Sequence, residues 1–566
     1  MGAGLSLNLG FGFALANQLP LRDKDRPNVV FVLTDDQDLH LDSLQYMPFV
    51  RKHLIEKGTS FNKHYCTTAL CCPSRVTLWT GKVPHNTNVT DVNPPYGGYP
   101  KFVNQSLNDN YFPVWLQQAG YNTYYTGKLF NAHTVLNYND PYPRGYTGSD
   151  FLLDPFTYEY LNSTFQRNQE APRSHEGEYS TDVMAEKAYG FLNDAVRDLE
   201  NRPFFLTVAP ISPHANVHIT AYSETNQMSV FTEPIPAKRH EHLFKDVKVP
   251  RTKNFNPDQV TIWGKLVARP AAAEPVNVDY NDHFYRQRLR SLQAVDELVD
   301  GLITRLEGYG ILENTYFVYS SDNGYHIGQH RLQPGKTCGY EEDINVPLII
   351  RGPGIAENQE ADIVTSHTDL APTFLELLGI PLQGDFDGSP IPLMAEELRS
   401  AENARREHVN VEFWGRAIGE GIYEPKPEYS LYYSVWCNNE HELYDMTVDP
   451  GQLHNLLAAD GHPLESEALI AGRSISDVVS RLDALLFVLK SCKGRTCREP
   501  WKQLHPAGNV ETLADALRSR YDEFYAEQAS VSFEYCAAGY IVNAEGPMWE
   551  TDSLMIRDGA PWYEWV

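Results

Sequence analysis

Two adjacent cysteines, Cys71 and Cys72, stand directly before a Pro-Ser-Arg string that ends at Arg75. Proline suits the first turn of a helix, where its missing N–H costs nothing, so we expect a helix to begin near Cys71 and to end at Gly81. Free N–H groups at a helix start favour a bound anion, and Arg75 adds a fixed positive charge one turn along. Either cysteine could instead be half of a disulfide at the helix start.

Oxygen-bearing side chains follow two predicted strands. Asp35 and Asp36 close the first strand of the chain, and Asp322 and Asn323 close a later one. Ligands of open α/β sheets bind beyond the carboxyl ends of the strands, so we expect these four residues to lie together. Hard oxygen donors without a companion Cys or His cluster suit Ca²⁺ or Mg²⁺ rather than Zn²⁺. Each pair by itself is also an ordinary turn or cap signal.

The elements that must position these residues alternate between strand-like apolar runs and helical patterns from residue 28 onward. This alternation predicts an α/β architecture with a largely parallel sheet. The strands are expected within residues 28–36, 122–128, 203–214, 315–324 and 346–354. Helices are expected over 111–120, 285–310 and 369–379, the last with Asp369 as its N-cap and Gly379 as its stop.

The length of 566 residues exceeds what one compact core accommodates, so we expect a large and a smaller domain. The chain turns polar and charged over residues 392–406, before a new strand pattern at 408–414. We therefore place a catalytic domain at 25–400 and a C-terminal domain at 401–566.

The formal net charge is −27, from 47 basic and 74 acidic side chains. A field of this sign repels nucleic acid and anionic membranes, which argues against both as partners. A small anionic substrate would need a local positive pocket.

The apolar leader over residues 1–16 ends in a small-x-small pattern and is interpreted as a signal peptide, although its lack of Lys and Arg leaves an ordinary leader as the alternative. Glycosylation sequons at Asn88, Asn104 and Asn162 agree with passage through the secretory pathway. No later segment has the length and apolarity of a membrane span. We expect a secreted glycoprotein.

Cysteines in that compartment usually pair. Of the eight cysteines, Cys492 and Cys497 are close enough in sequence to close a small loop. The sequence assigns no pairing to the remaining candidates, which are Cys66, Cys72, Cys338, Cys437 and Cys536.

The string Cys-x-Pro-Ser-Arg followed by Thr-Gly-Lys resembles the signature of the type I sulfatases. The resemblance covers most of residues 27 to 460, with further matching segments such as "GYHIGQHRLQPGK" and "ELYDMTVDPGQLHNLL". It implies an alkaline-phosphatase-like α/β sandwich with a smaller C-terminal α+β domain built on an antiparallel sheet and a helix. It also implies that a formylglycine-generating enzyme oxidises Cys71 to formylglycine.

Formylglycine explains why a cysteine belongs at residue 71. Its hydrated aldehyde has two hydroxyls, so one can attack sulfur to give a covalent sulfoenzyme and the other can later lose a proton to expel sulfate. In this family the positions of Asp35, Asp36, Asp322 and Asn323, together with the modified Cys71, hold a divalent cation, usually Ca²⁺, with Mg²⁺ the alternative.

The resemblance also assigns the positive groups of the site. Lys128 and Lys336 match the two family lysines that contact sulfate or the bridging oxygen, and Arg75 is the third cation. His214 matches the family histidine, and we assign it as general acid to the leaving alcohol.

One position departs from the family pattern. The family often reads Gly-Lys-x-His, but Phe130 stands where that histidine is expected. His133, three residues further on, is the candidate that could reach the formylglycine in its place.

The expected function is therefore hydrolysis of sulfate monoesters, most like the secreted arylsulfatases. Three alternatives stay open: a sulfatase of N-acetylglucosamine-6-sulfate or another sugar sulfate, a phosphodiester or phosphonate ester hydrolase of the same superfamily, and an inactive Ca²⁺-binding glycoprotein.

Overall fold

The computed structural model describes residues 26–223, 226–258, 277–401, 407–414, 419–425, 429–465 and 468–549. The signal peptide predicted over residues 1–16 lies outside these ranges. Among the helices that the structure describes, none combines the length and the apolar character that a membrane crossing requires.

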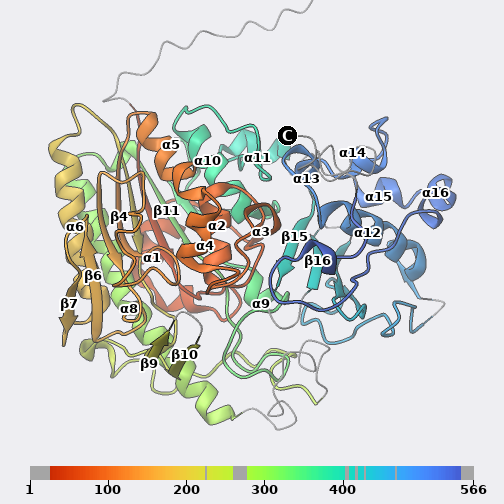
Figure 1. The fold of residues 1–566 in the computed structure, drawn as a ribbon, viewed down its shortest axis with the longest axis horizontal. Helices are drawn as coiled ribbons and strands as arrows, with labels where there is room; N and C mark the ends of the chain where they lie inside the picture. The colour runs from red at the N-terminus through yellow and green to blue at the C-terminus, as the bar shows by residue number, and fades with distance from the viewer. Residues whose placement is uncertain are drawn as a thin grey trace, which may run out of the picture.

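A ten-stranded mixed sheet forms the centre of the molecule (Figure 1). Its strands are β1 (Asn28–Thr34), β2 (Thr59–Phe61), β4 (Asn122–Lys128), β5 (Gly148–Leu152), β6 (Asn162–Arg167), β7 (Arg173–Glu176), β8 (Phe204–Ala209), β11 (Thr315–Ser321), β12 (Leu348–Arg351) and β13 (Gln359–Ala361). Their order is β13-β2-β12-β11-β1-β8-β4-β5-β6-β7. The five strands from β11 to β5 run parallel, whereas β6, β7 and β12 join in antiparallel fashion. The predicted α/β architecture is confirmed.

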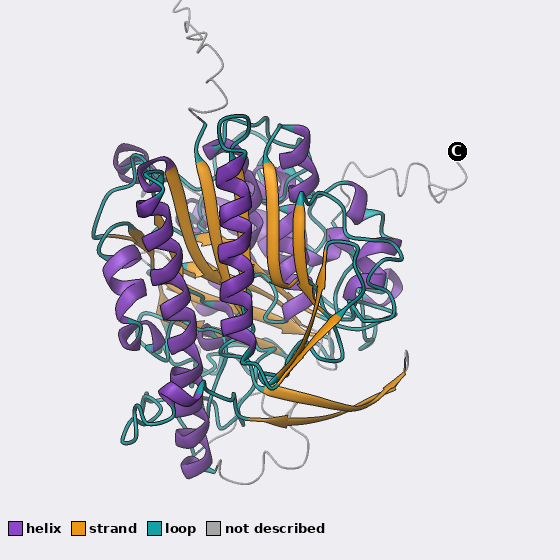
Figure 2. Ribbon diagram, turned by 90° about the vertical axis from the view of Figure 1, so that its left-hand side faces the viewer, coloured by secondary structure: helices purple, strands orange, loops and turns teal. Residues whose placement is uncertain are grey.

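Helices cover both faces of this sheet, as Figure 2 shows. One apolar core includes residues of α1 (Pro48–Val50), α6 (Ser180–Arg197) and α8 (Val278–Gly308). The core on the opposite face includes residues of α2 (Cys71–Thr80), α4 (Gly98–Asn104), α5 (Phe112–Gln118), α10 (Leu370–Leu377) and α11 (Ala395–Ala401). The sheet is thus covered on both sides, which is why its central strands β1, β4, β8 and β11 are buried along their whole length.

Short elements connect these layers. They are α3 (Pro84–Thr87), α9 (Glu341–Ile344), the β3 (His64–Tyr65) and β14 (Thr365–Ser366) pair, and the antiparallel β9 (Asn216–Ser223) and β10 (Asn226–Thr232). The β9–β10 ribbon projects from the body of the molecule (Figure 2).

The structure shows where two predicted helices begin. The helix expected from residue 285 begins at Val278, where the Asn277 side chain accepts a hydrogen bond from the Tyr280 N–H. Asp369 is the N-cap of α10, as the sequence predicts, although its side chain makes no capping bond to that helix. A 3-10 turn over His367–Asp369 precedes α10: Ser366 is the N-cap of this turn, and Asp369 closes a capping box on the Ser366 N–H at 2.9 Å. The helical turn starts earlier because this reciprocal pair satisfies two free N–H groups.

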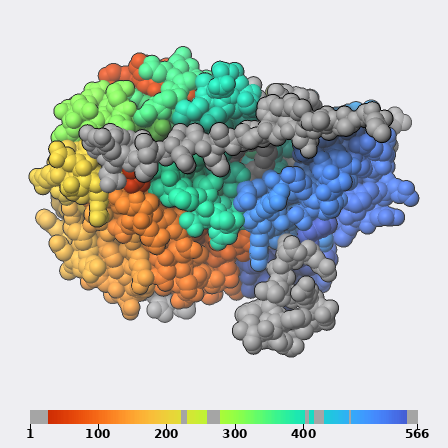
Figure 3. All heavy atoms as spheres, turned by 90° about the horizontal axis from the view of Figure 1, so that it is seen from above, coloured from red at the N-terminus to blue at the C-terminus, as the bar shows by residue number. Residues whose placement is uncertain are grey.

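The C-terminal region forms its own antiparallel sheet, β15 (Val409–Phe413), β16 (Gly419–Pro425), β17 (Ser430–Trp436) and β18 (His441–Asp445). It packs with α12 (Ile475–Leu489) in a separate apolar core. The remaining elements are β19 (Leu469–Ile470), β20 (Arg473–Ser474), α13 (Arg495–Arg498), α14 (Trp501–Leu504), α15 (Leu513–Ala516) and α16 (Asp522–Ala526). This region occupies one end of the molecule (Figure 3). The domain boundary at residue 400 stays a prediction.

Two disulfides lie in the C-terminal region. Cys492–Cys497 closes the small loop that the spacing predicts, and Cys437 pairs with Cys536 across 99 residues. Cys66, Cys71, Cys72 and Cys338 are free and buried. Cys71 and Cys72 are therefore not halves of a disulfide at the helix start.

His85 ties the C-terminal region to the helices that cover the large sheet. Its Nδ1 donates to Glu412 Oε1 at 2.7 Å, and its Nε2 donates to the Cys492 carbonyl oxygen at 2.7 Å. A ring that donates from both nitrogens is an imidazolium. Burial by itself lowers the pKa of His85, but the Glu412 carboxylate outweighs it, so the pKa of His85 is raised.

This pair predicts a pH-dependent stability. The contribution of charged His85 is fully present below pH 6.5, the ordinary histidine pKa, and is lost as the pH rises through the raised folded-state pKa. The melting-temperature difference between wild type and His85→Gln should therefore be largest below pH 6.5 and shrink above it. The control is His218→Gln, which removes an exposed partner of Glu159. A His85→Gln difference that stays constant between about pH 5 and about pH 9 would contradict the assignment.

Candidate active site

The ends of β1 and β11 bring the predicted oxygen donors together. The two strands are parallel neighbours with Thr34 opposite Ser321, so the residues that follow them meet at one edge of the sheet. The Asp36 N–H donates to Asp322 Oδ1 at 3.1 Å, and Asn323 Nδ2 donates to Asp36 Oδ1 at 2.8 Å. The parallel pairing of β1 and β11 therefore brings these side chains together, as the sequence predicts.

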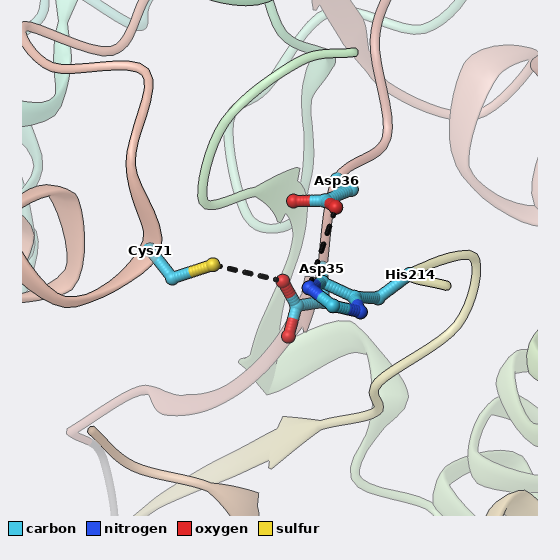
Figure 4. A group of neighbouring side chains, drawn as sticks. All are labelled: Asp35, Asp36, Cys71 and His214. Carbon is cyan, nitrogen blue, oxygen red and sulfur yellow. Dashed lines mark hydrogen bonds and ion pairs between the residues drawn. The ribbon is translucent and has the colours of Figure 1, made fainter. Parts of the chain in front are cut away.

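The helix α2 brings Cys71 to the same place. Cys71 is the first residue of the helix and Gly81, with φ of 66°, terminates it, as the sequence predicts. The Cys71 Sγ–H donates to Asp35 Oδ1 at 3.4 Å (Figure 4). The Ser74 hydroxyl donates to the Asp322 carbonyl oxygen at 2.5 Å and lies 2.8 Å from His367 Nδ1, which fixes the helix to the end of β11.

Two fully buried cationic side chains, Lys128 and Arg75, pair with carboxylates near Cys71. Lys128, the last residue of β4, donates to Asp35 Oδ2 at 2.5 Å, and Arg75 Nε donates to Asp322 Oδ2 at 2.8 Å. Arg75 also donates to the Lys128 carbonyl oxygen at 2.7 Å. Buried charged side chains of this kind are stable only when each is paired with an opposite charge, because an isolated charge in the interior is costly.

Two further predicted residues approach from the less buried side. Lys336 Nζ contacts Asp36 and lies 2.6 Å from Cys71 Sγ. His214 Nε2 lies 3.6 Å from Asp36 Oδ2, and its Nδ1–H donates to the Ala215 carbonyl oxygen at 2.7 Å. Lys336 and His214 retain some exposure whereas Lys128 is fully buried, so their side of the cluster is the one nearer to solvent.

The electrostatics match this arrangement. Burial alone would raise the pKa of Asp35, but Lys128, His214 and Arg75 lower it, so the carboxylate stays ionised. For Lys336 burial opposes the charge, yet Asp36 raises its pKa well above the usual range. Burial raises the pKa of the Cys71 thiol to about 12.

The donor set fits a divalent cation. Asp35, Asp36 and Cys71 have ligand atoms within 4.8 Å of one another, with His214 in the same group. Asn323 Oδ1 is buried and has no hydrogen-bond partner among the described residues, so an acceptor is left for an ion. Carboxylate and amide oxygens suit Ca²⁺ or Mg²⁺.

Reasoning from sequence missed Arg288. Its guanidinium, on α8, donates to the Asp36 carbonyl oxygen at 2.5 Å and to the Pro213 carbonyl oxygen at 3.3 Å. Arg288 thereby joins the loop of Asp36 to the loop of His214. An arginine inside a long helical pattern carries no motif, so no sequence signal distinguishes it.

His133 lies among aromatic rings. Its ring is 4.5 Å from Tyr99 and 5.5 Å from Phe151, and neither ring nitrogen has a hydrogen-bond partner among the described residues. Burial lowers the pKa of His133 to about 3, so the ring is neutral. His133 therefore has the environment of a core side chain.

Comparison with known proteins agrees with the site. The Sulfatase family model matches residues 27–380, and the model of the C-terminal part of N-sulphoglucosamine sulphohydrolase matches residues 328–469. An arylsulfatase of Volvox carteri is 38% identical over 90% of this chain and 82% of its own length. Human N-acetylglucosamine-6-sulfatase is 31% identical over 84% of this chain and 86% of its own length.

A solved structure supports the fold. BT4656, in complex with its substrate D-glucosamine-2-N,6-O-disulfate, has a TM-score of 0.60 at 23% identity and covers 76% of this chain and 93% of its own. The chain therefore has the alkaline-phosphatase-like α/β fold. The chain belongs to the sulfatase family and is a sulfuric ester hydrolase.

Proposed function

We propose that the chain is an arylsulfatase whose nucleophile is residue 71 after oxidation to formylglycine. The observation that carries this proposal is the position of Cys71 at the start of α2, with its Sγ 3.4 Å from Asp35 and 2.6 Å from Lys336. A hydrated aldehyde at the same Cβ would carry hydroxyls into these contacts.

The chemistry then proceeds in two steps. One hydroxyl of the hydrated aldehyde attacks sulfur and gives its proton to the Asp35 carboxylate, while the ester oxygen leaves as the alcohol with a proton from His214. The second hydroxyl then gives its proton to the now neutral His214, the carbon–oxygen bond to the sulfate breaks, and sulfate leaves. The aldehyde is regenerated for hydration by water, and Asp35 returns its proton to the solvent. Asp35, within reach of residue 71, accepts a hydrogen bond from the attacking group.

A divalent cation would be held by Asp35, Asp36, Asp322 and Asn323 together with residue 71, and we propose Ca²⁺. When bound, it supplies positive charge that lowers the pKa of the nucleophile and stabilises charge on the sulfate oxygens. The unpartnered Asn323 Oδ1 supports this assignment.

The two lysines and the histidine are proposed to act differently. Both lysines would bind the sulfate oxygens. Lys128 would bind them from its fully buried position beside Asp35, and Lys336 would bind them from the more exposed side. His214 has its proton on Nδ1, bonded to the Ala215 carbonyl oxygen, so Nε2 is the atom that faces the substrate. To act as an acid, Nε2 takes up a second proton; burial lowers the pKa of His214 despite the nearby Asp36 and Asp35, so this proton is readily given to the leaving oxygen.

This division predicts a dependence on the leaving group. A phenolate of low pKa departs without a proton, whereas an alkoxide requires one, so His214→Ala should cost little with nitrophenyl sulfate and about 10²- to 10⁴-fold with alkyl or sugar sulfates. Lys128→Ala and Lys336→Ala should lose activity across the whole series, because the sulfate oxygens are present in every substrate. The measurement is kcat/KM over phenyl sulfates of graded leaving-group pKa. Parallel lines for wild type and His214→Ala would contradict the acid role.

The substrate class is proposed from the relatives. The 38% identical relative is named an arylsulfatase, whereas the 31% identical human relative is named for N-acetylglucosamine-6-sulfate, which keeps that sugar ester as the second candidate. A panel of phenyl sulfates, N-acetylglucosamine-6-sulfate and matched phosphate esters, assayed with fully modified protein, separates the two and tests the phosphorus alternative. We expect the highest kcat/KM on phenyl sulfates.

We also propose secretion, with one preferred glycan site. Asn104 is the last residue of α4, and its whole sequon is exposed. In the other sequons Val89, Thr90 and Ser163 are buried. After expression in a eukaryotic secretory host, peptide mass spectrometry following enzymatic glycan removal should show conversion of Asn104 to Asp. A glycan at Asn88 with none at Asn104 would contradict this prediction.

A further inference from the structure

The ring of Tyr158 contacts two of the predicted site residues. Tyr158 lies in the segment between β5 and β6, where no motif marks it. Its ring stacks on the His214 imidazole, with centroids 4.2 Å apart and planes 25° apart. Lys128 Nζ lies 4.8 Å from the centroid of the same ring. Tyr158 is only 7% exposed, so the ring is a fixed wall of the site.

Tyr158 is held at both ends. Its hydroxyl accepts a hydrogen bond from Asn131 Nδ2 at 2.7 Å, and its carbonyl oxygen accepts one from the Val217 N–H at 3.3 Å. Asn131 lies three residues after Lys128, in the segment where the histidine of the family pattern is missing. That segment therefore supplies a side chain that supports the ring instead of a second histidine.

The other contacts of His214 are made by its main chain and by the edges of its imidazole, including Nε2, which lies 3.6 Å from Asp36 Oδ2. Nδ1 donates to the Ala215 carbonyl oxygen, and the His214 carbonyl oxygen accepts from the Tyr160 hydroxyl at 2.8 Å. These bonds fix the main chain and one edge of the imidazole. The flat contact with Tyr158 covers a face of the ring, and stacked rings prefer a defined offset geometry.

The Tyr158 ring also contacts the Lys128 ammonium. Asp35 holds one side of the ammonium, and the Tyr158 ring adds a face with negative partial charge to another. A single ring thus touches both the group proposed to protonate the leaving oxygen and a group proposed to bind the sulfate.

We propose that Tyr158, anchored by Asn131, is a positioning residue that sets the angle of the His214 imidazole relative to the ester. The inference rests on the proposed role of His214. Misplacing a reacting group by about 1 Å costs about 10²-fold in rate. We therefore expect Tyr158→Leu, which keeps apolar bulk and removes the flat face, to lower kcat by about 10- to 100-fold with a smaller change in KM.

The experiment measures kcat and KM over phenyl sulfates of graded leaving-group pKa. For Tyr158→Leu the loss should grow with leaving-group pKa, as it does for His214→Ala. Tyr158→Phe keeps the ring and loses only the bond from Asn131, so it should lose less than the leucine variant. The matched control is Tyr189→Leu, which removes a tyrosine ring lying 3.5 Å from the Arg305 guanidinium on the outer helices, and it should keep the wild-type kcat.

A double-mutant cycle separates this inference from the acid role of His214. If Tyr158 acts through His214, then Tyr158→Leu should cost less in a His214→Ala background than in wild type. A loss that is equal across the series, together with an additive cycle, would overturn the inference. If His214→Ala itself shows no dependence on the leaving group, the acid role fails, and the cycle alone decides the positioning role: a non-additive cycle supports it and an additive cycle overturns it.

Thermal melting shows whether Tyr158→Leu is folded. If it is not, Asn131→Ala, which keeps the ring and removes its anchor, takes its place in the series. A loss that grows with leaving-group pKa would then support the inference, and a loss that is equal for all esters would overturn it.

Discussion

Cys71→Ala is expected to lower kcat/KM by about 10⁵- to 10⁶-fold, which is the order of loss when a covalent nucleophile is removed. The reason is that the proposed reaction has no other group at the start of α2 that can bond to sulfur. Alanine removes only the Sγ that contacts Asp35 and Lys336, so the fold should remain intact. Steady-state kinetics on nitrophenyl sulfate and a melting curve make the measurement.

Cys72→Ala is the matched control for that substitution. Cys72 is the next residue, is equally buried, and burial raises its thiol pKa to about 12 as well. It packs in the apolar core on the α2 face of the sheet and has no place in the proposed chemistry. Its variant should keep catalysis while losing some thermal stability. Comparable loss of activity in both variants would mean that the helix start is needed for folding, and not residue 71 for chemistry.

Asp36→Asn is expected to remove the bound ion and to lower kcat by about 10³-fold or more. Asp36 is the carboxylate where Lys336, Asn323 and His214 converge, so loss of its charge affects the whole edge of the site. Asparagine is preferable to alanine at such a position because it keeps the volume. Alanine at Asp322 would remove the carboxylate that pairs with Arg75 Nε and leave Asp35, at 3.6 Å, as its ion-pair partner; breaking a buried ion pair costs about 3–5 kcal/mol.

Elemental analysis of the purified variants measures the ion directly. Wild type should contain about one equivalent of Ca²⁺ or Mg²⁺ per chain and lose activity on chelation. Asp38→Asn, two residues along and also buried, should retain the full ion content. Stoichiometric zinc in wild type, or an unchanged Ca²⁺ content in Asp36→Asn, would contradict the site.

Prediction from sequence succeeded where a local pattern carried the information. The alternation of strands and helices, the residues after β1 and β11, and the helix from Cys71 to Gly81 all follow from periodicity and from turn residues. The antiparallel placement of β12 could not be predicted from the sequence, because strand order depends on packing between distant segments.

The supporting residues of the site were also beyond reach. Arg288 acts through contacts with two main-chain carbonyl oxygens, and Tyr158 through the flat face of its ring. Neither contact leaves a pattern in the sequence, because the partners are far away along the chain. The pairing of Cys437 with Cys536 was unassigned for the same reason.

The central claim is that residue 71 is formylglycine in the active protein. Peptide mass spectrometry of the α2 peptide, from protein made in a cell that contains the modifying enzyme, tests it most directly. The account predicts that this peptide carries an aldehyde or its hydrate at residue 71 and an unmodified thiol at Cys72, with activity proportional to the aldehyde fraction across preparations. A fully active preparation in which residue 71 is an intact thiol would contradict the account.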